Sequence, residues 1–136
     1  MTDDCIFCKI VKGDIPSNKV YEDDEFLAFL DIKPINPGHT LIVPKIHCKG
    51  LLDFPKAEET DLFEFIKKVA NAIMKATKAE GFNLGMNNGE VAGQVIPHAH
   101  FHIIPRFSND GFRPWQHSEY KKGEMEEVQK KIKNFL

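Results

Sequence analysis

The chain has 136 residues, 42% of them hydrophobic and 28% charged, which favours one globular domain over a disordered chain. The formal net charge of −2 excludes a bulk positive field for nucleic acid, so we expect no nucleic-acid partner. No apolar run reaches the roughly 20 residues that span a bilayer, the N-terminus lacks the pattern of a secretory signal, and three cysteines are a poor disulfide framework. We therefore expect no membrane partner and a cytoplasmic protein.

The first part of the chain predicts short strands joined by turns. A short apolar segment, 5–11, precedes a turn in KGDIPSNK. Residues 20–22 and 26–31 are typical of two strands, with Asp23 and Asp24 as the hairpin turn between them. After a loop rich in proline and glycine, the β-branched and apolar residues of 39–44 predict a third strand.

A long helix is predicted over about 57–80. Its apolar face consists of residues spaced by three and four: Leu62, Phe65, Ile66, Val69, Ile73 and Thr77. Gly81 is expected to cap the end of the helix. Strands are predicted at 82–86 and at 96–104, the latter stopped by Pro105. A C-terminal helix is indicated by Met125, Val128, Ile132 and Phe135.

These elements predict an α+β fold of about five mostly antiparallel strands, one long helix and a C-terminal helix. We expect a single domain over 1–136, with a core of about 1–107 and a C-terminal extension over 108–136.

Three of the six histidines lie in PHAHFHIIP, residues 97–105. Side chains alternate along a strand, so His98, His100 and His102 should face one way and the apolar residues between them the core. Packed imidazoles oppose each other's charging, so their pKa values should be lowered. Two interpretations stay open: a metal site made of all three, or nucleophilic attack by one histidine that the others tune.

Cys5 and Cys8 form a C-x-x-C pair at the start of the chain. Such a pair is a zinc half-site, a redox pair or incidental. A closed tetrahedral zinc site needs two further ligands, for which His47 and one of the three clustered histidines are candidates.

The loop MNNGEVAGQ directly precedes the histidine segment. Its glycines allow close backbone approach, and exposed amides in such a loop bind phosphate oxygens. A plain Asn-Gly turn is the competing interpretation.

The sequence resembles the histidine triad (HIT) superfamily, most closely its Hint-like and small HIT-hydrolase members. The resemblance rests on HAHFHII, on CIFCKIVKGDIPSNKVYEDDEFLAFLDI, on PGHTLIVPKIH and on NNGEVAGQVIPHAHFHIIPR. It implies a nucleotide hydrolase that releases AMP from purine nucleoside phosphoramidates or diadenosine polyphosphates. The alternatives are a nucleotidyltransferase or phosphorylase and a largely non-catalytic nucleotide-binding regulator.

The resemblance also assigns roles to single residues. His100 is implied as the nucleophile that forms a nucleotidyl-histidine intermediate, with His102 and His39 on the phosphate side. The implied nucleotide-binding residues are Asp31 for the ribose, Asn87 and Gln94 for phosphate, and Phe7, Ile15, Phe29 and Ile32 around the purine.

One structural zinc ion per chain, held by Cys5, Cys8, His47 and His98, and a homodimer are implied in the same way. Val95 departs from the pattern, because many members have serine or threonine there, and this leaves the leaving group open.

Overall fold

A computed structural model of the chain describes residues 2–113 and 115–136, apart from the side chains of residues 57–60. The predicted domain over 1–136 therefore includes two positions, 1 and 114, outside this description. In chain order the elements are α1 (Ile6–Lys12), β1 (Lys19–Glu22), β2 (Phe26–Leu30), β3 (Thr40–Pro44), α2 (Lys56–Thr77), β4 (Gly81–Gly85), the 3-10 turn η1 (Glu90–Ala92), β5 (Phe101–Arg106) and α3 (Glu124–Lys133).

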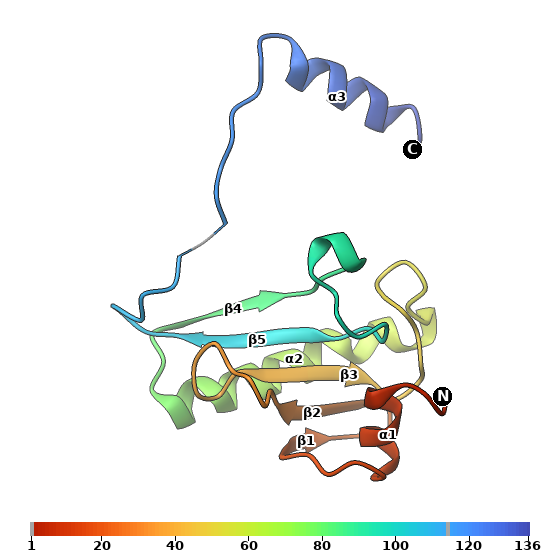
Figure 1. Ribbon diagram of the computed structural model, residues 1–136, viewed down its shortest axis with the longest axis vertical. Coiled ribbons are helices and arrows are strands. Elements are labelled where there is room, and N and C mark those ends of the chain that lie inside the picture. Colours follow the sequence, from red (N-terminus) through yellow and green to blue (C-terminus); the bar gives the residue numbers. More distant parts are fainter. Residues whose placement is uncertain (1, 114) are drawn as a thin grey trace.

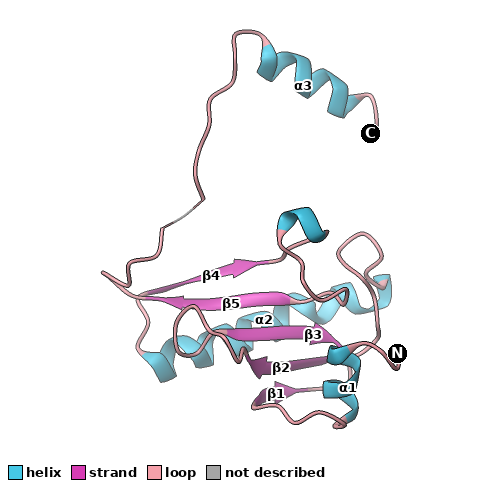
Figure 2. Cartoon of the chain, viewed as in Figure 1, coloured by secondary structure: helices cyan, strands magenta, loops and turns pink. Residues whose placement is uncertain are grey.

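The five strands form one sheet in the order β1-β2-β3-β5-β4, and every neighbouring pair is antiparallel (Figure 1). The α+β prediction is confirmed. The α2 helix covers one face of the sheet, while α1 packs against the other face beside β2 and β3 (Figures 1 and 2). Because side chains alternate along a strand, Phe26 and Ala28 of β2 face α2 while Leu27 and Phe29 face α1, and both sets are buried since both faces are covered there.

Side-chain hydrogen bonds set the first turns. Cys5 precedes α1 and its Sγ accepts from the Cys8 N–H at 3.4 Å. The predicted hairpin turn forms because Asp23 Oδ1 accepts from the backbone N–H groups of Glu25 and Phe26, both at 2.8 Å.

The long helix buries the predicted face but ends earlier than expected. Leu62, Phe65, Ile66, Val69 and Ile73 all lie in the core. The helix stops at Thr77, because Lys78 adopts a left-handed backbone with a φ of 59°. Gly81 therefore does not cap the helix but opens β4.

The last strand is shifted toward the C-terminus relative to the prediction, and Pro105 does not stop it. The β5 strand begins at Phe101 and passes through Pro105, which pairs with Phe82 of β4. Proline is tolerated because the pairing of β5 with β3 ends at Ile103, so no ladder donor is needed at Pro105 on that side. His98 and His100 thus precede the regular strand.

Beyond β5 the chain runs out to α3, which stands apart from the sheet (Figure 1). The C-terminal helix is as predicted, but none of its residues is buried, and Met125, Ile132 and Phe135 are exposed. Among the helices in the described ranges, none has the length and apolar character required to cross a membrane.

Candidate active site and metal centre

The three clustered histidines lie on the face of the sheet opposite α2. Ala99, Phe101 and Ile103 point into the core beneath α2, as the alternation predicts. His98 and His100 are buried on the other face and His102 is half-buried. The alternation persists before the ladder begins, where the Ala99 N–H donates to the Cys48 carbonyl at 2.7 Å.

At the first of these histidines, four donor atoms from three segments converge. The Nδ1 atom of His98 lies 3.4 Å from Cys5 Sγ, 3.6 Å from Cys8 Sγ and 3.2 Å from His47 Nδ1. Cys8 Sγ lies 3.4 Å from His47 Nδ1. All four atoms are within 4.8 Å of one another, so the cluster has the size of a metal site.

The chemistry of this cluster fits zinc. A tetrahedral zinc with bonds of about 2.0 Å to nitrogen and about 2.3 Å to sulfur separates two nitrogens by about 3.3 Å and a nitrogen from a sulfur by about 3.5 Å. The distances above agree with these values. His98 Nε2 lies 2.8 Å from the Pro44 carbonyl and must carry the proton there, which leaves Nδ1 with its lone pair toward the cluster. Burial lowers the pKa of His98, and the nearby His47 lowers it further.

The middle histidine has one ring nitrogen committed to the backbone. His100 Nδ1 lies 2.8 Å from the carbonyl of His98, an acceptor only, so Nδ1 donates and Nε2 keeps its lone pair. Phe7 packs edge-on against the ring at a centroid distance of 5.2 Å. The geometry therefore holds His100 in the tautomer that suits a nucleophile.

The third histidine is oriented by a chain of hydrogen bonds. The Ile35 N–H donates to His39 Nδ1 at 3.1 Å, so His39 carries its proton on Nε2. That Nε2–H donates to His102 Nδ1 at 2.9 Å, which places the proton of neutral His102 on its own Nε2. Asp31 Oδ2 lies 3.7 Å from His39 Nε2, and this carboxylate also accepts from the Lys33 N–H through Oδ1.

Both rings of this pair favour the neutral form. Burial, together with smaller effects of His100 and His39, lowers the pKa of His102 to about 4 against an opposing effect of Asp31. Burial also lowers the pKa of His39, against the opposing charge of Asp31. His102 is therefore neutral at pH 7 and presents an Nε2–H donor.

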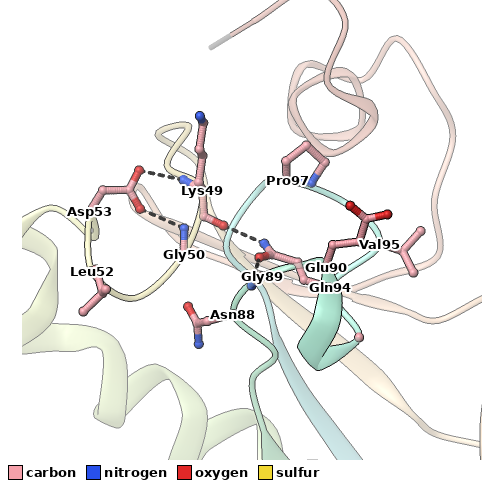
Figure 3. Close-up of a pocket in the computed structure, with 11 residues that line it drawn as sticks. Lys49, Gly50, Leu52, Asp53, Asn88, Gly89, Glu90, Gln94, Val95 and Pro97 are labelled. Carbon is pink, nitrogen blue, oxygen red and sulfur yellow. Dashed lines mark hydrogen bonds between the residues drawn. The ribbon is translucent and has the colours of Figure 1, made fainter.

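The glycine-bearing loop before the histidines is tied to the loop after β3 (Figure 3). Gln94 Nε2 donates to the carbonyls of Lys49 at 2.6 Å and Ile96 at 3.1 Å, and its Oε1 accepts from the Gly89 N–H at 2.9 Å. The Leu51 N–H donates to Asn88 Oδ1 at 2.7 Å. The Gln94 amide, predicted to hold phosphate, is thus occupied within the protein, and the groove between the two loops has a volume of about 800 Å³.

Comparison with known proteins decides the family. Residues 12–109 match the HIT domain. The chain belongs to the HIT family.

The relatives of this HIT protein include named enzymes. It is 46% identical over 102 residues to an adenosine 5'-monophosphoramidase of Schizosaccharomyces pombe, covering 75% of this chain and 74% of that protein. It is 46% identical over 110 residues to an adenylylsulfatase of Arabidopsis thaliana, covering 81% of this chain and 56% of that protein.

Solved structures share the fold of this HIT protein. A HIT family member from Bacillus subtilis has a TM-score of 0.89 at 42% identity, with 98% of each chain covered. A zinc-bound histidine triad protein from Mycobacterium smegmatis has a TM-score of 0.76 at 31% identity, also with 98% of each chain covered.

The residues predicted to surround a purine differ in exposure. Phe7 and Phe29 are buried in edge-on contact at a centroid distance of 5.6 Å, and Ile15 packs half-buried against the same cluster. Ile32 is 90% exposed. The chain alone thus brings Phe7, Phe29 and Ile15 together and leaves Ile32 at the surface.

One cavity beside the histidines includes residues that the sequence did not indicate. A cavity of about 540 Å³ joins His39, His102 and Asn87 to Phe112, Arg113 and Trp115 from the segment after β5. The signal was present, since a cation and two aromatic side chains stand together in GFRPW, but nothing in their spacing relates them to the histidines.

Proposed function

We propose that this HIT protein hydrolyses purine nucleotide conjugates at the α-phosphate through a nucleotidyl-His100 intermediate and releases AMP. The observation that carries the proposal is the pairing of tautomers. His100 offers an Nε2 lone pair while the neighbouring His102 offers an Nε2–H, with their ring centroids 5.1 Å apart. A nucleophile and a hydrogen-bond donor for the leaving group thus lie side by side, and relatives of this chain are named adenylylsulfatase and adenosine 5'-monophosphoramidase.

In the first step the His100 Nε2 lone pair attacks the α-phosphorus. A phosphorus–nitrogen bond forms as the bond to the leaving group breaks. Neutral His102 donates its Nε2–H as a hydrogen bond to the departing atom, and that atom takes its proton from solvent water, because loss of the Nε2 proton would leave His102 an anion. The His39 Nε2–H donor at 2.9 Å orients the His102 ring for this hydrogen bond.

In the second step water attacks the phosphorus of the intermediate. The phosphorus–nitrogen bond breaks, its electron pair returns to His100 Nε2, and the water gives up a proton to solvent, which balances the proton that the leaving group took. AMP leaves and both histidines are in their starting protonation states. Splitting one displacement into two provides an activated participant for each.

The nucleoside and phosphate contacts extend this proposal. Asp31 binds the ribose hydroxyls, since its half-buried carboxylate lies beside His39. Phe7, Ile15, Phe29 and Ile32 contact the purine. Asn87 contacts phosphate. The hydrogen bonds of Gln94 favour a different role for its side chain, which is to hold the glycine-bearing loop before the histidines in place.

We also propose one structural zinc per chain, held by Cys5, Cys8, His47 and His98. Four protein ligands leave no open position, so the ion would join α1 to the sheet and take no part in the chemistry. Thiolate ligands must be reduced, which favours a reducing compartment such as the cytoplasm.

A homodimer is proposed from the surfaces that the chain leaves exposed. The edge strand β4 exposes Phe82 and Leu84, and α3 exposes its apolar face. Light scattering should give twice the chain mass, and a mass of one chain would reject the dimer.

Hydrolysis is tested with adenosine 5'-phosphoramidate and the variant His100→Ala. Loss of the nucleophile should lower kcat by about 10⁴-fold or more. Wild-type protein quenched during turnover should carry covalent AMP, and the variant should carry none. Equal AMP release by both proteins would refute the role of His100, and ADP formed in phosphate buffer would indicate phosphorolysis instead.

A further inference from the structure

The cavity beside His102 has a wall that the proposed chemistry does not use. Its floor is the sheet face formed by β4 and β5, and its opening is bordered by the segment that follows β5. Gly85 pairs with His102 across the ladder, and a Cβ at Gly85 would meet no atom within 4 Å. The space next to His102 is therefore open, with room for a group attached to the phosphate.

The segment that borders the cavity is anchored by an ion pair. Arg106 Nε donates to Asp110 Oδ2 at 2.7 Å, and its Nη2 donates to Asp110 Oδ1 at 2.9 Å and to the Phe112 carbonyl at 2.8 Å. Asn36 Nδ2 donates to the same carboxylate at 3.0 Å. The turn before Arg113 is thus held in place, although Arg113 and Trp115 themselves are exposed.

The charge of the cavity is positive and comes from one side chain. The Arg106 charge is balanced by Asp110, and no aspartate or glutamate is among the described residues that line the cavity. Within residues 2–113 and 115–136, Arg113 makes no hydrogen bond or ion pair. Its guanidinium is always charged and offers five donors suited to phosphate or sulfate oxygens.

Aromatic side chains line the same cavity. Phe112 is 48% exposed and Trp115 is 88% exposed. A cavity that exposes aromatic surface and a guanidinium suits a ligand that carries a flat ring as well as negative charge.

Building on the proposed hydrolase function, we propose that this cavity binds the leaving group and that Arg113 makes the enzyme prefer leaving groups that carry negative charge. Trp115 adds a stacking surface for a leaving group that also carries a nucleobase. His102 connects the two parts of the site, because the atom that accepts its Nε2–H hydrogen bond is the atom through which the leaving group was attached. The substrate class is therefore adenylyl conjugates of oxyanions, either sulfate or a second phosphorylated nucleoside.

The test compares three conjugates that share the adenylyl group. The leaving group is a neutral amine in adenosine 5'-phosphoramidate and a small anion in adenylyl sulfate. In diadenosine triphosphate the leaving group is an anion that also carries a nucleobase. For each protein the measured quantity is the ratio of kcat/KM for an anionic conjugate to that for the phosphoramidate. Arg113→Gln should lower both ratios about fivefold, and Arg113→Lys should restore part of the loss.

The control variant is Lys75→Gln. It removes an exposed cation of α2, which is far from Arg113 in the sequence, and it should leave the ratios unchanged. Trp115→Ala should lower the ratio for diadenosine triphosphate about threefold and not that for adenylyl sulfate. A ratio unaltered by Arg113→Gln, with phosphoramidate still hydrolysed, would overturn the subsite but leave the hydrolase function intact. No AMP from any conjugate and no covalent AMP on His100 would overturn the hydrolase function itself.

Discussion

The Nδ1 atom of His98 is unprotonated and lies within 3.6 Å of two cysteine sulfur atoms and the Nδ1 of His47. At His102, four residues further on, the corresponding Nδ1 accepts a hydrogen bond from His39. Asp31, His39 and His102 are also close enough to hold a metal ion. The difference is that the lone pairs in the second group are directed at N–H donors. What the other ring nitrogen binds thus decides whether a histidine suits a metal ion or a hydrogen bond to a substrate.

The largest expected effect concerns the cluster at His98. In the variant Cys5→Ser/Cys8→Ser, zinc measured by elemental analysis should fall from about one per chain to none. Because an ion that binds only the folded state stabilises it, the melting temperature should fall by about 10 °C. Cys48→Ala is the matched control and should retain zinc. Wild-type protein without zinc after purification free of chelators would reject the site.

A smaller effect is expected at the second group. His39→Asn keeps an acceptor for the Ile35 N–H but removes the donor to His102, so the His102 tautomer is no longer fixed. We expect kcat to fall by about 10- to 100-fold while the zinc content stays constant. His117→Asn replaces an exposed histidine of the C-terminal segment as a control. A loss of zinc in His39→Asn would show that the two groups are not separable.

The smallest effect is the pH dependence of stability. The pKa of His102 falls from its ordinary value of 6.5 to about 4 on folding, so between these values the unfolded chain binds more protons. The free energy of unfolding should therefore decrease as the pH falls through this window. Between pH 7 and pH 4, the wild type should lose about 1 kcal/mol more than His102→Asn, a figure reduced for the partial exposure of the ring. If denaturant titrations gave parallel pH profiles of the free energy of unfolding for the wild type and His102→Asn, the lowered pKa of His102 would be contradicted.

Local pattern predicts local geometry well in this chain. The alternation of Ala99, Phe101 and Ile103 with the histidines needs only the two-residue period of an extended chain, and it survives although β5 starts at Phe101. The bounds of the elements depend on neighbours instead. Whether Pro105 ends a strand depends on where the pairing with β3 stops, and that register is not present in the local sequence.

Side chains that are distant in the sequence show the same difference between what a local pattern predicts and what depends on the folded chain. The spacing of Cys5 and Cys8 indicates half of a metal site, but the position of His47, 39 residues after Cys8, follows only from the folded sheet or from the family resemblance. The hydrogen bonds of Gln94 and the place of Arg113 in the cavity depend on loops that carry no periodic pattern.

The backbone carbonyl of His98 gives these observations a common consequence. Its side chain belongs to the cluster that could hold a metal ion, while its carbonyl fixes the His100 tautomer at 2.8 Å. In the proposed mechanism, a shift of His98 that accompanies attack on phosphorus would therefore also alter the geometry of the proposed zinc site. By thermodynamic linkage, a nucleotide that changes the affinity for zinc by some factor has its own affinity changed by zinc through the same factor. Metal affinity measured with and without AMP would therefore report on how strongly the two sites are coupled.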